Sequence, residues 1–263
     1  MPRAARKISS TKVYHVILRG NDKQDIFLEE QDYNKFIKEI VKTKEKYKYE
    51  LYVYCMMTNH IHLIIYDPND KLSKILQSIS ISYTSYFNKK YERVGHLFQN
   101  RFLSKNVETS EYLKNVCRYI HKNPVKSGID RLKEYKWSSY LEYINEEKII
   151  DSKQILTLFG NSKTEAINNF IAFHQNTIQE EIIDFLEYEI TDKLNDEQAL
   201  KYIIKILEIR NIKELKDFSK EKIKKHLKRL EGIKGISNLQ IARITGLSRR
   251  IIDEIIINER RKG

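Results

Sequence analysis

The sequence contains few cysteines and no long apolar run, and each shortage excludes a class of protein. Cys55 and Cys117 are too few for a disulfide framework and lack the spacing of a zinc site, so we expect two reduced thiols in a core. No apolar segment approaches the ~20 residues that a membrane-spanning helix needs, and no apolar stretch of a signal peptide follows the basic start. We therefore expect a cytoplasmic protein without a membrane partner.

Positive charge is what the sequence has in excess. Its 48 Lys and Arg residues against 36 Asp and Glu give a net charge of +12. Such a charge does not specify a fold, but it predicts attraction to polyanions, among which nucleic acid is the natural candidate here. Charge alone leaves open a basic protein that binds no nucleic acid. The hydrophobic content of 41% argues against intrinsic disorder.

Residues 1–145 show strand-like alternation and helix-like spacing in turn. Six segments follow in the order strand, helix, strand, strand, helix, strand: 12–21, 31–48, 50–57, 60–66, 71–91 and 97–107. A further helix is predicted after the cap residue Thr109 and is expected to end near Lys122, because Pro124 disfavours helix before it. This order predicts an α+β fold, a ferredoxin-like or split-βαβ antiparallel sheet with helices on one face.

Residues 146–263 have a different character, because they are charged and helical without strand-like alternation. Within 237–258 a helix, a turn at Gly246 and a second helix are predicted, with Leu247, Ile251 and Ile255 as an apolar stripe. This pattern is typical of a helix-turn-helix DNA-binding unit. The alternative is a packed helix pair with solvated basic residues. We expect two domains that meet at 145/146.

A paired-histidine motif, His60-Ile61-His62, lies on one of the predicted strands. Side chains alternate between the two faces of a sheet, so both histidines project to one side and Ile61 to the other. Two imidazoles about 6–7 Å apart along the backbone can converge on one divalent ion. The alternative is a pair of histidines that share a polar sheet face.

A second motif is the segment Arg118-Tyr119-Ile120-His121-Lys122-Asn123-Pro124. Tyr119 and Asn123 are four residues apart, so a phenol and an amide share one face of a helix. Alternatively, Tyr119 packs at a helix end and Asn123 forms a turn. If His60, His62 and Asn123 hold a metal ion that polarises a phosphate, the Tyr119 phenol is predicted to attack that phosphate as a nucleophile.

Four stretches resemble the single-tyrosine HUH transposases, and most closely the REP-associated tyrosine transposases. They occur in the family's order within residues 8–145: YHVILRGN from Tyr14, MMTNHIHL from Met56, GHLFQNRF from Gly95 and YIHKNPVKSG from Tyr119. The resemblance implies that His60 and His62 bind Mg²⁺ or Mn²⁺, that Asn123 completes the metal shell and that Tyr119 is the nucleophile. It also implies strand transfer through a 5′-phosphotyrosine, with single-stranded or hairpin-forming DNA as the partner.

Further residues are candidates for DNA contacts. His15 and Arg19 share a face of the first strand, and Arg249 and Arg250 open the second helix of the C-terminal pair. The complete set is His15, Arg19, Asn21, Arg101, Lys122, Lys126, Arg249 and Arg250.

Three other functions compete with a transposase. A catalytically silent DNA-binding regulator would have the same fold, and a replication initiator or relaxase would use the same histidine pair. A zinc hydrolase would need a carboxylate base, but the nearest downstream acid, Asp67, lies past the end of the strand. No GxxxxGK[ST] phosphate loop is present, so we expect no nucleotide cofactor. Either a monomer or a homodimer fits the sequence.

Overall fold

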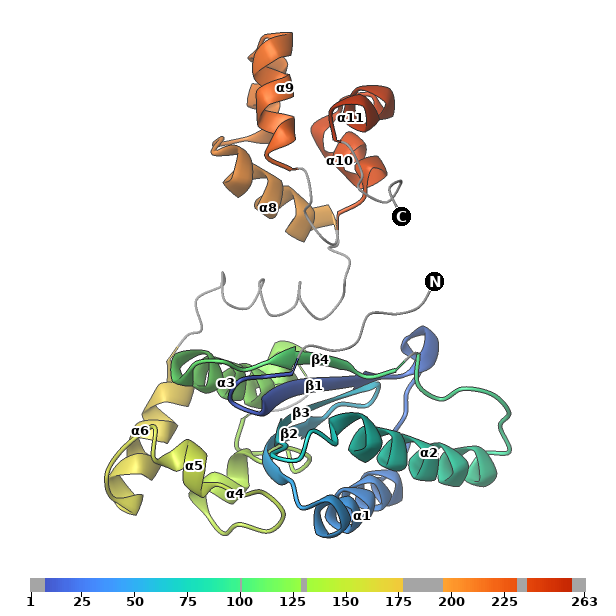
Figure 1. Cartoon of the computed structure of the whole chain (residues 1–263), viewed down its shortest axis with the longest axis vertical. Coiled ribbons are helices and arrows are strands. Elements are labelled where there is room, and N and C mark those ends of the chain that lie inside the picture. The colour runs from blue at the N-terminus through green and yellow to red at the C-terminus, as the bar shows by residue number, and fades with distance from the viewer. Residues whose placement is uncertain (1–7, 100, 129–131, 177–195, 231–235, 257–263) are drawn as a thin grey trace. The chain divides into compact units, whose positions relative to one another are not determined.

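A computed structural model describes residues 8–99, 101–128, 132–176, 196–230 and 236–256 (Figure 1). The chain divides into two compact units, Met1–Gln179 and Glu180–Gly263. Among the described residues, no helix combines the length and apolar character required to cross a membrane.

A four-stranded antiparallel sheet forms the centre of the first unit, in the order β2-β3-β1-β4. Its strands are β1 (Val13–Arg19), β2 (Glu50–Met56), β3 (His60–Tyr66) and β4 (Leu103–Asn106). The first three lie within the predicted segments. Of the fourth, 97–107, only the last part forms β4, and Phe98 makes an isolated bridge to Gly20.

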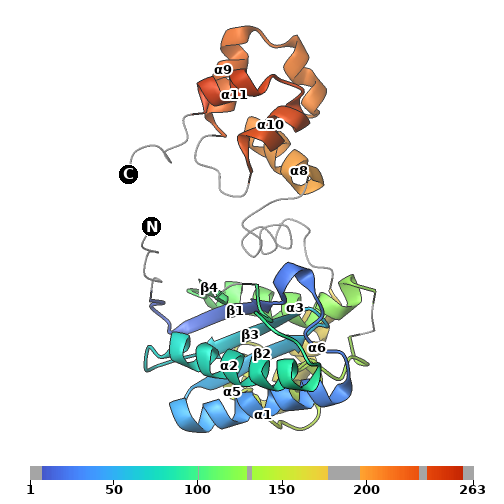
Figure 2. The same cartoon turned by 90° about the vertical axis from the view of Figure 1, so that its right-hand side faces the viewer.

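Two long helices, α1 (Glu30–Tyr47) and α2 (Leu72–Lys90), cover one face of the sheet, as Figures 1 and 2 show. Asp32, fully buried, fixes the start of α1 by accepting hydrogen bonds from the backbone N–H groups of Leu28 and Glu29. It also accepts one from the Lys90 ammonium of α2. The predicted split-βαβ arrangement is thereby confirmed for the sheet and these two helices.

Helix α3 (Ser110–Lys126), which follows the split-βαβ unit, lies against the face of the sheet opposite α1 and α2 (Figure 2). The helix begins as expected, because the Thr109 hydroxyl accepts the N–H of Tyr112. It does not end near residue 122 but continues through Pro124. The Asn123 carbonyl beside the proline still receives the N–H of Ser127, which closes the last turn.

Three shorter helices complete the first unit: α4 (Tyr140–Ile144), α5 (Lys153–Leu156) and α6 (Lys163–Gln175). Helix α6 packs against α3 and α4. Residues 146–176 therefore belong to the first unit, and the division of the chain differs from the boundary expected at 145/146. The change in composition there is real, but a charged helical segment can still bury one face against a neighbouring domain.

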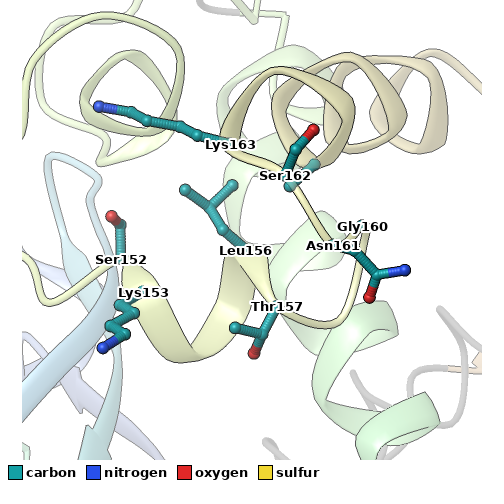
Figure 3. Close-up of a pocket in the computed structure, with 9 residues that line it drawn as sticks. Ser152, Lys153, Leu156, Thr157, Gly160, Asn161, Ser162 and Lys163 are labelled. Carbon is teal, nitrogen blue, oxygen red and sulfur yellow. The ribbon is translucent and has the colours of Figure 1, made fainter.

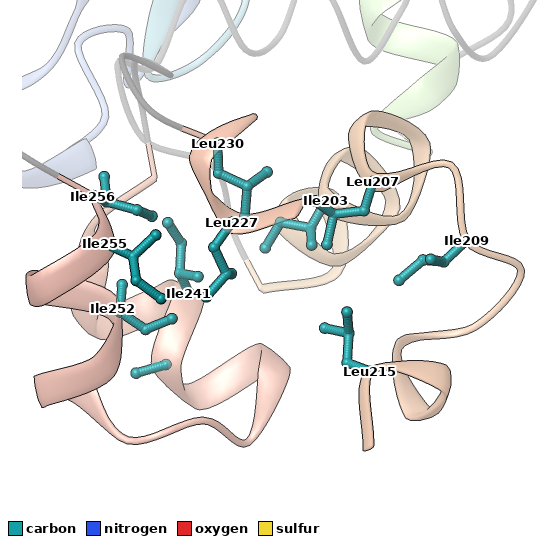
Figure 4. Packing of buried hydrophobic residues seen from close by; sticks show 11 residues of the cluster. Ile203, Leu207, Ile209, Leu215, Leu227, Leu230, Ile241, Ile252, Ile255 and Ile256 are labelled. Atoms are coloured by element: carbon teal, nitrogen blue, oxygen red, sulfur yellow. The ribbon is translucent and has the colours of Figure 1, made fainter. Parts of the chain in front are cut away.

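The second unit is helical, as expected from its composition. It contains α8 (Asp196–Leu207), the 3-10 helix η2 (Ile212–Asp217), α9 (Lys220–Lys228), α10 (Asn238–Thr245) and α11 (Arg249–Ile255). Figure 4 shows the core they share, formed by Ile203, Leu207, Ile209, Leu215, Leu227, Leu230, Ile241, Ala242, Ile252, Ile255 and Ile256.

The predicted helix, turn and helix of the second unit are α10, a left-handed Gly246 and α11. Gly246 has a φ of +71°, which glycine adopts without the strain that a Cβ would bring. The predicted apolar stripe was wrong at one position, because Ile251 is 39% exposed while Ile252 is buried. Residues 257 and 258 of the predicted unit lie outside the described residues.

Candidate active site

The paired histidines of β3 project toward α3, as the strand alternation predicts. The His60 and His62 rings have their centroids 5.0 Å apart and stand nearly perpendicular. The ring of Tyr119, from α3, meets His62 edge to face at 5.8 Å. Tyr119 is 3% exposed. Two elements that are far apart in sequence thus bring a phenol and two imidazoles together.

Asn123 joins this group one helical turn after Tyr119. Its amide nitrogen donates a hydrogen bond to the Tyr119 carbonyl at 3.0 Å, and its side chain lies close enough to His60 to raise the pKa of that imidazole. Because the amide nitrogen is directed along the helix, the amide oxygen is the group that faces the imidazole. The side chains of His60, His62 and Asn123 therefore lie beside one another and carry two imidazoles and one amide oxygen.

Both imidazoles are held in the neutral form that metal ligands require. Burial, reinforced by the positive charge of Arg19, lowers the pKa of His60 to about 4. Burial also lowers the pKa of His62 well below its usual value, with smaller contributions from His60, His15 and Arg19. The Asn59 side-chain oxygen accepts a hydrogen bond from Nδ1 of His60 at 2.7 Å, which leaves Nε2 with its lone pair.

His15 is buried rather than exposed on an open sheet face, and its contact with a DNA phosphate stays a prediction. It is 2% exposed, and its Nε2 lies 3.1 Å from Nδ1 of His62, with the two rings stacked. The prediction placed His15 correctly on the face of Arg19 but assumed that this face was open, whereas α3 covers it. If Nδ1 of His62 donates to His15, Nε2 of His62 is free to bind a ligand.

Two predicted DNA-contact residues lie directly beside the histidines and the tyrosine. Arg19 is opposite His60 in the strand register and is half-buried. The Lys126 ammonium lies 5.3 Å from the centroid of the Tyr119 ring, and its side chain reaches solvent. Both cations are placed to attract a phosphate, and their contact with DNA stays a prediction.

The other five predicted DNA-contact residues differ in their surroundings. The Lys122 ammonium donates a hydrogen bond to the Asn176 carbonyl at 2.8 Å, so it helps to fasten the end of α6 to α3. Asn21, in the 3-10 turn Asn21–Lys23, and Arg101 are exposed. In the second unit, Arg249 and Arg250 are exposed at the start of α11, where Arg249 pairs with Asp253.

A surface pocket lies apart from these residues, between α5 and α6 (Figure 3). It is lined by Ser152, Lys153, Leu156, Thr157, Gly160, Asn161, Ser162, Lys163 and Ala166. None of the predicted site residues lines it. The candidate site is instead a buried polar cluster between a sheet and a helix.

One group of side chains capable of holding a metal contains none of the predicted site residues. Cys117, His121 and His174 place one ligand atom each within 4.8 Å of the others. Both cysteines are reduced and buried, as expected. The spacing of the cysteines predicted no zinc site, but Cys117 belongs to a group of side chains that could hold a metal. The four-residue separation of Cys117 and His121 was a readable signal, whereas His174 comes from a distant helix.

Comparisons with known proteins show similarity to transposases in the first unit. Residues 9–123 match the family model described as "Transposase IS200 like". A REP-associated tyrosine transposase of Haemophilus influenzae is 29% identical over 127 residues, covering 43% of this chain and 72% of the relative. A solved REP-associated tyrosine transposase, bound to a REP hairpin, has a TM-score of 0.47 and 18% identity, covering 55% of this chain and 86% of that one. Residues 9–123 are therefore similar to the IS200-like transposases.

Proposed function

We propose that the first unit is a metal-dependent nickase and strand-transferase for single-stranded DNA, with Tyr119 as its nucleophile. One observation carries the proposal: the Tyr119 ring lies 5.8 Å from the His62 ring, on the sheet face to which His60 also projects. A phenol beside a site for a Lewis acid is what a phosphate-attacking tyrosine needs. The similarity of residues 9–123 to the IS200-like transposases supports DNA as the substrate.

His60, His62 and Asn123 are the residues that would hold the ion. The neutral imidazoles and the amide oxygen are suitable donors, and the hydrogen bonds to Asn59 and His15 orient the two rings. Because two of the three donors are nitrogens, we expect Mn²⁺ to bind more tightly than Mg²⁺. When bound, such a cation would polarise the scissile phosphate and neutralise the charge that develops on it.

The chain's own residues must activate the tyrosine and position the strand. An ordinary phenol, with a pKa of about 10, is a poor nucleophile at neutral pH. The Lys126 ammonium near the Tyr119 ring and Arg19 beside His60 can each receive a phosphate oxygen and so hold the strand near the phenol. Since the tyrosine is 3% exposed, DNA binding must open the layer around it.

The proposed reaction exchanges one phosphodiester for another. The Tyr119 oxygen forms a bond to phosphorus, the bond from phosphorus to the 3′ oxygen breaks, and the phenolic proton is balanced by protonation of the departing oxygen. The products are a 5′-phosphotyrosine and a free 3′-hydroxyl. The linkage keeps the energy of the phosphodiester, so a 3′-hydroxyl can attack it and rejoin the strand without ATP.

The second unit is the candidate for a separate DNA contact. Arg249 and Arg250 are exposed at the start of α11, which follows the turn at Gly246, and recognition helices of this type use their first residues. We expect an Arg249→Ala, Arg250→Ala double variant to bind DNA more weakly. The slope of the logarithm of the affinity against the logarithm of the salt concentration should become shallower by about 1 to 2. Binding isotherms at several salt concentrations test this, and unchanged affinity and slope would exclude the contact.

A hairpin oligonucleotide with single-strand flanks tests the proposal. We expect a strand labelled at its 3′ end to enter a denaturation-resistant adduct with the protein when Mn²⁺ or Mg²⁺ is present. A strand labelled at its 5′ end should yield a shorter fragment with a free 3′-hydroxyl. Chelation of the ion should prevent both.

Two outcomes would count against the proposal. Free 5′-phosphate products without an adduct would indicate ordinary hydrolysis. If the protein binds a library of hairpins but cleaves none of them, the catalytically silent regulator is favoured. If it nicks duplex DNA that contains no hairpin, the replication initiator or relaxase is favoured.

A further inference from the structure

A second cluster of metal-ligating side chains lies between α3 and α6, and the proposed reaction does not use it. Cys117 and His121 are one helical turn apart on α3, and His174 comes from α6. Sγ of Cys117 is 3.8 Å from Nδ1 of His121, which is 3.0 Å from Nε2 of His174. All three side chains are buried.

The outer nitrogens of both imidazoles are fixed by hydrogen bonds. Nδ1 of His174 is 2.8 Å from the Phe170 carbonyl, which can only accept, so this nitrogen carries the proton and Nε2 keeps its lone pair. Nε2 of His121 is 2.8 Å from the Ser139 hydroxyl, which in turn lies 3.2 Å from the Tyr54 carbonyl. Histidines that bind metals typically have such partners on the opposite ring nitrogen.

Two of the three separations between donor atoms are close to those around a metal of small radius, and the third, from Sγ of Cys117 to His174, is within 4.8 Å. Zinc binds thiolate sulfur at about 2.3 Å and imidazole nitrogen at about 2.0–2.1 Å, so its tetrahedral ligands lie roughly 3.3–3.6 Å apart. The separations of 3.0 and 3.8 Å bracket this range. Three protein donors leave the fourth position to a non-protein ligand, because the group contains no fourth cysteine, histidine or carboxylate among the described residues.

The surroundings separate the donors from solvent, and because burial raises the pKa of the Cys117 thiol, a metal must displace the thiol proton when it binds. The rings of Tyr140, Tyr143 and Phe170 pack within 6.0 Å of the His121 ring and separate the cluster from solvent. The Tyr140 hydroxyl is itself buried and lacks a hydrogen-bond partner in the part of the chain described. Burial also favours the neutral imidazoles that a metal requires.

We propose that Cys117, His121 and His174 bind one thiophilic metal ion of the zinc class. The ion joins α6 to the helix that carries Tyr119. Two hydrogen bonds also connect α3 to α6 and its C-terminal end. Arg118 donates to the Phe173 carbonyl, and Lys122 donates to the Asn176 carbonyl. The ion is structural, and its donor set is distinct from His60, His62 and Asn123.

A metal-free alternative uses the same distances. In that case Nδ1 of His121 carries a proton and donates it to Nε2 of His174, while the Ser139 hydroxyl donates to Nε2 of His121. Every nitrogen is then satisfied, and Cys117 is only a buried neighbour. The two arrangements differ in metal content, which is directly measurable.

The test uses the full chain, purified without a histidine tag, and requires no DNA, so its result is independent of the proposed cleavage. Mass spectrometry of the metal content should find about one zinc per chain. Chelation should lower the melting temperature by at least about 5 °C, and Zn²⁺ alone should restore it.

Matched variants assign the metal to this site. Cys117→Ser should lose the zinc, whereas Cys55→Ala removes an equally buried thiol and should keep it. His60→Ala should also keep it. If Cys117→Ser does not fold, Co²⁺ added to the metal-free wild-type chain provides a second readout, since a thiolate ligand gives a charge-transfer band in the near ultraviolet.

Three results would overturn the proposal: a zinc-free chain whose stability does not respond to Zn²⁺, zinc that is retained by Cys117→Ser, or a Co²⁺ spectrum without the thiolate band. The first would establish the hydrogen-bonded arrangement of His121 and His174.

Discussion

Replacement of Tyr119 by Phe should abolish formation of the protein–DNA adduct and reduce strand cleavage at least about a thousandfold. The change removes the attacking oxygen and nothing else, because the ring keeps its contact with His62. DNA affinity, measured by fluorescence anisotropy, should change less than about threefold. The separation of binding from cleavage distinguishes a nucleophile from a residue that only packs.

A matched control is available on the same helix. Tyr112 lies two helical turns before Tyr119, so Tyr112→Phe removes a phenolic oxygen from the same side of α3. We expect it to cleave DNA at close to the wild-type rate. If Tyr119→Phe cleaved normally, or if both variants lost activity equally, Tyr119 would not be the nucleophile.

The second large effect is expected at the paired histidines. His62→Ala and His60→Ala should each slow cleavage roughly a hundredfold or more, because the loss of a ligand removes several kcal/mol of charge stabilisation. A higher Mn²⁺ concentration should recover part of the rate, which titration of cleavage against Mn²⁺ would reveal. If His60→Ala and His62→Ala left the cleavage rate unchanged, no metal ion would act at these two histidines.

His15 provides a graded comparison. It touches His62 but is one step removed from the ion, so His15→Phe should weaken Mn²⁺ binding by about 10- to 100-fold and leave the maximal rate closer to normal. His15→Gln keeps a hydrogen-bonding group toward Nδ1 of His62 and should retain more affinity. Equal Mn²⁺ affinity in all three proteins would contradict the orienting role of His15.

Local pattern was sufficient to predict much of the first unit. Strand alternation at His60 and His62 predicted their common face, and the four-residue separation of Tyr119 and Asn123 predicted their common side of α3. The error about the end of α3 has a local cause. A proline in the last turn costs only one hydrogen bond when the following residues, here Ser127, can still close the helix.

Tertiary contacts explain what pattern could not predict. The position of α3 on the histidine face turns His15 from an exposed strand residue into a buried partner of His62. In the same way, His174 meets His121 across 53 residues of sequence, and no spacing rule links them. Periodicity states which side of an element a residue occupies, but not what covers that side.

The location of the covalent bond tests the central claim most directly. Trypsin cuts after Arg118 and Lys122, so Tyr119 is the only tyrosine of the short peptide Tyr119-Ile120-His121-Lys122. After reaction with DNA and digestion with nuclease and trypsin, mass spectrometry should find this peptide carrying a 5′-phosphonucleotide on its tyrosine. A nucleotide on any other residue, or cleaved DNA with this peptide unmodified throughout, would contradict the account.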